Sequence, residues 1–83
     1  MHYLLTFRSL TYAQRAARIL ERAGVVGTVS RVPKAAATKG CAYCVTIAAR
    51  HRDRAVDLLA SADLAPERIL LRNANGSLEV VSG

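Results

Sequence analysis

The sequence has little of several residue types, and each shortage excludes a class of protein. It contains no tryptophan, only two cysteines and only six acidic residues among 83 positions. Two cysteines are too few for the disulfide framework that stabilises small secreted domains. No apolar run reaches the roughly 18 residues of a membrane span, and the first residues lack the pattern of a signal peptide. These shortages predict a cytoplasmic protein without a membrane-spanning segment.

Residue patterns for nucleotide, acid–base and metal chemistry are also missing. The sequence has no phosphate-binding glycine loop, no dinucleotide-binding glycine pattern and no carboxylate pair with a recognisable role. His2 and His51 do not complete a zinc-ligand spacing with the two cysteines. We therefore predict no metal and no cofactor. The twelve Lys and Arg residues give a net charge of +6, which attracts anions without choosing among nucleic acid, acidic proteins and small molecules.

The hydrophobic pattern predicts one α+β domain over residues 1–83. Strands are expected at residues 2–7, 25–32, 41–48 and 67–72, and helices at residues 11–24 and 50–62. The order β-α-β-β-α-β predicts a ferredoxin-like sandwich, in which two helices cover one face of an antiparallel sheet. Residues 73–83 are interpreted as a turn followed by a short strand or tail. The other sheet face is expected to be open, which is compatible with a protein partner or a homodimer.

The ends of the first helix carry their own signals. Thr11 and Gln14 match a capping box, so the helix is expected to begin at Thr11. Gly24 is expected to end it, because glycine readily adopts the left-handed conformation of a C-terminal cap.

The segment KGCAYC, residues 39–44, holds both cysteines and permits two interpretations. One is the third strand of an RNA-recognition motif, whose octamer it matches at four positions. However, Cys41 stands where a base-stacking aromatic residue belongs. Strand parity also places Tyr43, Val45 and Ile47 on one face, the one expected to meet the helices. Sequence-specific nucleic-acid binding is therefore not predicted, while nonspecific contact with anions stays open.

The other interpretation is a thiol site. Sulfur chemistry requires the thiolate, which nearby positive charge favours. The residues expected to contribute are Cys41 and Cys44 as thiols, Lys34, Lys39 and Arg31 as cations, and Pro33 and Gly40 for loop geometry. In a regular strand the two cysteines would lie about 10 Å apart on opposite faces, so a disulfide between them requires a turn. Two cysteines that simply fill the core remain the alternative.

The order of several short matches resembles a known family. These are Thr6-Phe7, Ala23-Gly24, Val32-Pro33-Lys34 and Gly40-Cys41. Together they resemble the small bacterial domains described as putative selenium/sulfur carrier protein-like, over about residues 3–71. The resemblance implies a ferredoxin-like domain whose loop cysteine, here Cys41, holds a persulfide or selenide. Ala42 stands where the family has glycine, and Cys44 is an addition to its pattern.

Two functional hypotheses follow. The first is a small thiol carrier, an accessory protein rather than a turnover enzyme, in which Cys41 accepts sulfur or selenium from a donor protein and passes it to an acceptor. Lys34 and Lys39 would stabilise the anion, and Cys44 would resolve the persulfide through a transient disulfide. The second is a non-catalytic binding or regulatory module. It would use the open sheet face and basic surface to hold a protein or an anionic partner such as RNA.

Overall fold

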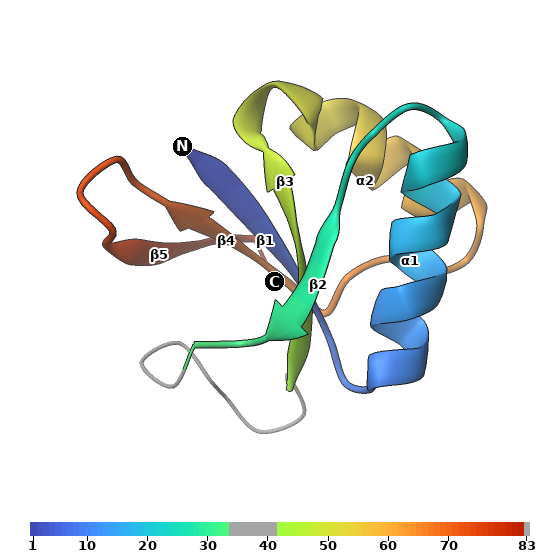
Figure 1. The fold of residues 1–83 in the computed structure, drawn as a ribbon, viewed down its shortest axis with the longest axis horizontal. Helices are drawn as coiled ribbons and strands as arrows, with labels where there is room; N and C mark the ends of the chain where they lie inside the picture. The colour runs from blue at the N-terminus through green and yellow to red at the C-terminus, as the bar shows by residue number, and fades with distance from the viewer. Residues whose placement is uncertain (34–41, 83) are drawn as a thin grey trace.

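A single antiparallel sheet of five strands forms the centre of the computed structural model, which describes residues 1–33 and 42–82 (Figure 1). The strands are β1 (His2–Phe7), β2 (Thr28–Arg31), β3 (Tyr43–Ala48), β4 (Arg68–Arg72) and β5 (Leu78–Ser82), in the order β2-β3-β1-β4-β5. The helices are α1 (Leu10–Arg22) and α2 (Arg52–Ser61), with a short 3₁₀ turn, η2 (Ala49–His51), before α2. The predicted α+β, ferredoxin-like architecture is confirmed. Within the described ranges no helix is long and apolar enough to cross a membrane.

Both helices lie on the same side of the sheet, as the prediction required (Figure 1). The main core fills the space between them and the sheet. Its buried members are Leu5, Phe7, Ala13, Ala16, Leu20, Val25, Val45, Ile47, Ala55, Leu59 and Ile69. Small alanines on both helices allow close approach to the large aliphatic side chains of the strands.

Strand parity is as expected from the sequence. Val45 and Ile47 of β3 are buried in the main core, and Tyr43 packs against it. In β1, Tyr3 packs against the same core, and Phe7 is one of its buried members. The sheet aromatics of the described chain therefore face the helices, and they do not form a stacking platform for bases on the opposite face.

The start of α1 differs from the prediction, while its end agrees. The N-cap is Ser9, whose Oγ accepts the Tyr12 N–H at 3.2 Å, so the helix begins at Leu10 and not at a Thr11 cap. An N-cap residue must stand just before the first helical residue, and Ser9 occupies this place. Thr11 is already inside the helix, so its hydroxyl cannot cap the first free N–H groups. At the other end Gly24 has φ +83°, and the Val25 N–H binds the Leu20 carbonyl at 2.9 Å. These features form a Schellman cap.

Strand β2 is shorter than the predicted residues 25–32. Val25 belongs to the helix cap, and Gly27 lies close to the Val45 side chain of β3. A Cβ at residue 27 would lie 2.5 Å from Cγ1 of Val45, closer than non-bonded carbon atoms can approach. Pairing with β3 therefore starts at Thr28, opposite Thr46.

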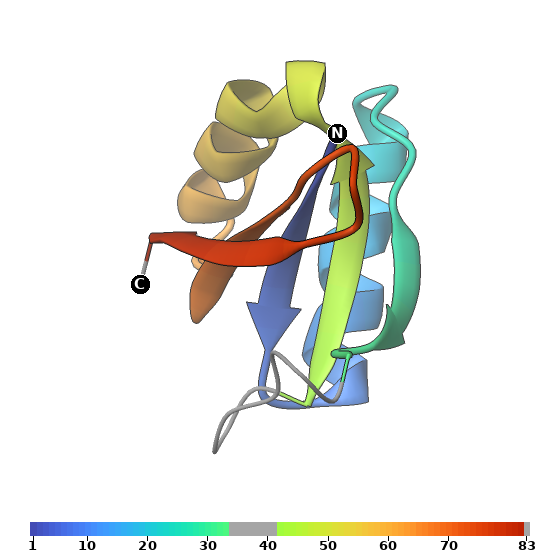
Figure 2. The same cartoon turned by 90° about the vertical axis from the view of Figure 1, so that its left-hand side faces the viewer.

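The sheet face away from the helices is less open than predicted. A second buried cluster lies there, made of Leu4, Val32, Cys44 and Leu70, with Leu78 packed against it. Figure 2 shows the cause in the backbone: β5 is strongly twisted and crosses the sheet on the side away from α1. A register shift between Ile69 and Leu70 accompanies this bend. The sequence predicts either a short strand or a tail after the turn. The structure has a strand there, β5, and it covers part of this face.

Replacing Leu4 by Ala tests the second cluster. Leu4 and Leu5 are both fully buried, on opposite faces of β1. We expect Leu4→Ala to lower the free energy of unfolding by about 2–4 kcal/mol, comparable to Leu5→Ala. Val80→Ala is the control, because Val80 is 56% exposed. Urea unfolding followed by circular dichroism measures all three, and a cost at Leu4 as small as that at Val80 would contradict burial of this face.

A double-mutant cycle tests the close approach of Gly27 to Val45. Gly27→Ala should cost about 1–3 kcal/mol because its methyl group meets Val45 Cγ1. In the Val45→Ala background this cost should fall by about 1 kcal/mol or more, since the opposing atom is gone. Gly24→Ala, which is strained only by its positive φ, should cost the same in both backgrounds. Equal costs for Gly27→Ala in the two backgrounds would show that the contact is unimportant.

Candidate functional site

The two chain ends that flank residues 34–41 are joined at one end of the sheet. Ala42 donates its N–H to the Phe7 carbonyl at 3.2 Å, and its own carbonyl accepts the Val32 N–H at 3.0 Å. The predicted site residues Lys34, Lys39, Gly40 and Cys41 lie outside the described residues. Their immediate neighbours in the chain are thus fixed beside the C-terminal end of β1.

Arg31 and Pro33 are the predicted site residues that precede residues 34–41 in the chain. Arg31 is the last residue of β2 and is paired with Tyr43 across the strands. Its guanidinium carbon lies 5.4 Å from the centre of the Tyr43 ring, within the range of a cation–π contact. Pro33 is half-buried just beyond the strand. Positive charge is therefore held where the chain leaves the sheet.

Cys44, the second predicted thiol, is fully buried in β3. Its Sγ lies 3.5 Å from the Ser30 Oγ, and its backbone is paired with Thr6 and Ser30 on either side. It packs with Leu4 and Leu70 in the cluster away from the helices. The described geometry of Cys44 is thus that of a packed core residue in a regular strand.

A pocket lies at the same end of the molecule as Ala42. It has a volume of about 410 Å³ and is formed where the start of α1 meets the segment after α2. Its lining consists of Phe7, Arg8, Tyr12, Arg15, Ala62, Asp63, Leu64, Ala65 and Glu67. Phe7 links the two features, because it lines the pocket and its carbonyl binds Ala42. A cavity of this size is in the range of small-molecule sites.

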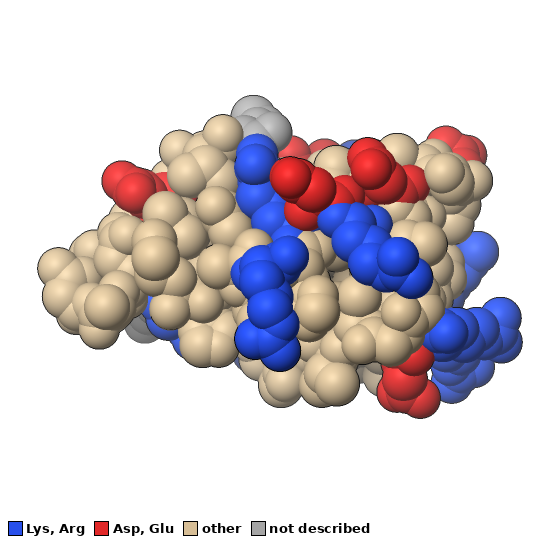
Figure 3. Space-filling view, turned by 90° about the horizontal axis from the view of Figure 1, so that it is seen from above, with Lys and Arg blue, Asp and Glu red and all other residues tan. Residues whose placement is uncertain are grey.

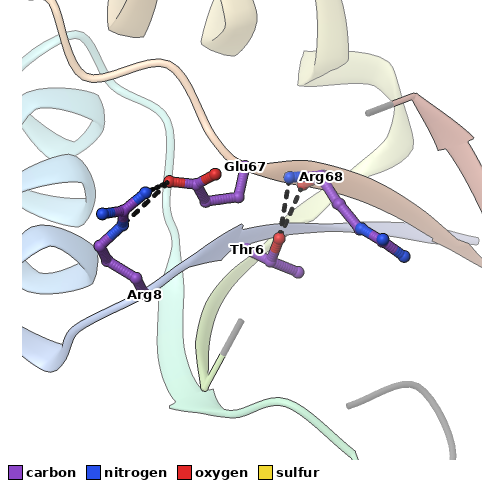
Figure 4. Close-up of polar contacts among 4 residues, drawn as sticks. All are labelled: Thr6, Arg8, Glu67 and Arg68. Carbon is purple, nitrogen blue, oxygen red and sulfur yellow. Dashed lines mark hydrogen bonds and ion pairs between the residues drawn. The ribbon is translucent and has the colours of Figure 1, made fainter. Parts of the chain in front are cut away.

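Polar contacts fix the wall of this pocket (Figure 4). Arg8 donates to Glu67 Oε1 from both Nε and Nη2, at 3.2 and 3.0 Å. Two residues earlier, the Thr6 hydroxyl accepts the Arg68 N–H at 2.9 Å and donates to the Arg68 carbonyl at 3.2 Å. The Glu67 N–H also binds the Thr6 carbonyl at 2.8 Å. Together these contacts hold the start of β4 against the end of β1.

Asp63 has an unusual backbone. It follows the C-terminus of α2 with φ 56°, and it is the only non-glycine residue of the described chain with a positive φ. The N–H groups of Asp63 and Leu64 bind the carbonyls of Ala60 and Leu59, at 3.1 and 2.9 Å. This is the same Schellman cap that Gly24 makes at the end of α1, with an aspartate in the left-handed position.

The described regions contain no cluster of metal ligands, and one end of the molecule carries charges of both signs (Figure 3). No group of three or more His, Cys, Asp or Glu residues is placed to hold a metal within residues 1–33 and 42–82. Seen from the end where α2 begins, Arg side chains lie beside acidic ones (Figure 3). One such pair is Arg52 and Asp53, at 3.5 Å.

Sequence reasoning missed the pocket. No functional motif distinguishes Asp63 and Glu67 from ordinary solvent-exposed acids, and Arg8 belongs to no such motif. Only the sheet topology brings Arg8 and Glu67, 59 positions apart, into contact. A better signal was available at Asp63, because a helix pattern ending in Ala-Asp-Leu without glycine leaves an aspartate for the left-handed position.

Comparison with known proteins gives one match. No curated protein and no solved structure matches the chain. A family model described as Putative Se/S carrier protein-like matches residues 2–71, from the first residue of β1 to the penultimate residue of β4. The match includes Cys41, both helices and every residue lining the pocket. Because it spans most of the 83 residues, the chain belongs to the putative Se/S carrier protein-like family.

Proposed function

We propose that the protein is a thiol carrier that holds sulfur or selenium on Cys41. The Cys41 thiolate attacks the outer sulfur of a donor persulfide, R–S–SH. The donor S–S bond breaks, R–S⁻ leaves, and Cys41–S–SH forms, so that no oxidant or reductant is consumed. A nucleophile of an acceptor protein then attacks the outer sulfur, and the Cys41 thiolate leaves. A selenium donor would react by the same exchange.

Family membership is the observation that carries this proposal. The family match covers Cys41, both helices and the strands from β1 to β4, as far as Leu71. The hydrogen bonds of Ala42 to Phe7 and Val32 support it, because they attach the residue after Cys41 to the sheet beside a pocket. A carrier needs a thiol on a segment that partner proteins can reach. It also needs a rigid scaffold to which that segment is attached.

Positive charge supports the thiolate form in this proposal. Lys34 and Lys39 are in the same segment as Cys41, and Arg31 ends the preceding strand. Cations near a thiol stabilise the thiolate and the persulfide anion. In this proposal Pro33 and Gly40, which both precede Cys41 in the chain, provide the loop geometry.

Cys44 has a smaller part in the proposal than the sequence suggested. Resolving the persulfide through a Cys41–Cys44 disulfide would require the buried Cys44 to leave its strand pairing with Thr6 and Ser30. We therefore assign the transferred atom to Cys41 alone, with Cys44 contributing to packing.

Mass spectrometry of the intact protein tests the carrier function. The reduced protein is treated with a small-molecule persulfide, and the mass of one added sulfur atom is measured. We expect addition to the wild type and to Cys44→Ala, and none to Cys41→Ser, because only Cys41 carries the proposed reactive thiolate. Loading that is equal in Cys41→Ser and the wild type would sink the proposal.

Alkylation kinetics test the assignment of Cys44. In the Cys41→Ser protein, iodoacetamide should modify Cys44 at least about a hundredfold more slowly under native conditions than in denaturant, because the reaction requires opening of β3. The Cys44→Ala protein reports Cys41 in the same assay, and it should react at a similar rate in both conditions. Fast native alkylation of Cys44 would restore it as a candidate partner of Cys41.

A further inference from the structure

The pocket beside Ala42 carries equal numbers of positive and negative groups. Arg8 and Arg15 contribute the cations, and Asp63 and Glu67 contribute the anions. Arg8 and Glu67 neutralise each other through their ion pair. Among the described residues Arg15 and Asp63 make no ion pair, although both line the same cavity. Within the part of the chain that the structure describes, the pocket thus presents one cation and one anion without an ion-pair partner.

The position of Asp63 is locally unfavourable in two ways. The left-handed backbone, which Gly24 adopts at the matching position of α1, brings Cβ close to a carbonyl oxygen and therefore costs more for aspartate than for glycine. A negative charge at the C-terminus of α2 is also repelled by the partial negative charge of the helix end. Residues that break local rules in this way are expected at functional sites, where the loss is compensated by binding.

We propose that this pocket binds a neutral zwitterion of the α-amino-acid class. Asp63 accepts hydrogen bonds from the ligand ammonium group, and Arg15 donates to its carboxylate. Among the lining residues, the half-buried Leu64 and the exposed Tyr12 offer apolar surface to the ligand side chain. A ligand with a net charge fits less well, because it leaves Arg15 or Asp63 without a partner.

The identity of the side chain rests on the proposed carrier function. If Cys41 takes its sulfur from a small molecule, the pocket beside Ala42 would hold that molecule, an amino acid whose side chain ends in a persulfide. The Cys41 thiolate would take the outer sulfur as the donor S–S bond breaks, and the thiolate of the amino acid, a cysteine in the simplest case, would leave. The pocket itself depends only on described residues, so ligand binding and sulfur loading can fail independently.

Titration of the Cys41→Ser protein with three related thiols tests the charge requirement. L-Cysteine has both charges, cysteamine lacks the carboxylate, and N-acetyl-L-cysteine lacks the ammonium group. Amide chemical shifts are followed by NMR up to about 20 mM ligand, since so small a ligand should bind with a dissociation constant of about 1 mM. We expect L-cysteine to shift the amides around Arg15 and Asp63, and each truncated compound to bind about tenfold more weakly.

Charge-removing variants locate the site. Arg15→Gln and Asp63→Asn should each weaken L-cysteine binding about fivefold to tenfold, and asparagine still tolerates the left-handed backbone. Arg18→Gln on α1 and Asp57→Asn on α2 are the matched controls, because both residues lie outside this pocket. They should leave binding unchanged.

A third variant separates binding from structure. Asp63→Gly should raise Tm by about 2–6 °C, because it removes both local penalties, and yet weaken L-cysteine binding. A purely structural role for Asp63 would instead lower Tm.

Three results would overturn the proposal: no shifts at the highest concentration, equal binding of all three thiols, or equal effects of the pocket and control variants. Sulfur loading on Cys41 without any L-cysteine binding would refute the zwitterion site and leave the carrier function standing. L-cysteine binding without loading would refute the carrier function and leave the zwitterion site standing.

Discussion

The structure depends on burial of β1 on both of its faces. Leu5 faces the helices and Leu4 faces the opposite side, and neither is exposed. The strand is also paired along both edges, with β3 on one side and β4 on the other. In a chain of 83 residues, which can bury only a limited core, one strand thus takes part in both apolar clusters and in two ladders.

The pocket and Ala42, the residue that follows Cys41 in the chain, both lie at the C-terminal end of this strand. Phe7 is the last residue of β1, and it contributes a core side chain, a pocket wall and the acceptor for Ala42. Thr6 and Arg8, on either side of it, bind the start of β4 through the main chain of Arg68 and the side chain of Glu67. A packed strand thereby gives the proposed site a rigid base.

Much of the fold could be predicted because its signals are local. The apolar run of β1 and the alternation of Tyr43, Val45 and Ile47 both led to the observed burial. The errors have non-local causes. No local pattern shows that Gly27 must approach the Val45 side chain closely, or that Leu78 of β5 packs against the cluster that contains Leu4. The pocket is hidden for the same reason, since Arg8 and Glu67 meet only after β1 and β4 have paired. The order of the short family-like motifs led to the prediction of Cys41 as the carrier thiol, and Cys41 lies outside the described residues.

The central position of β1 has a consequence for synthesis of the chain. Strand β1 is synthesised before both of its neighbours in the sheet, because its ladders are completed by residues 43–48 and 68–72. Until then β1 and α1 have no sheet on which to bury their apolar faces. The domain therefore has a long-range contact pattern for its size, and we expect it to fold in one late, cooperative step rather than progressively from its N-terminus.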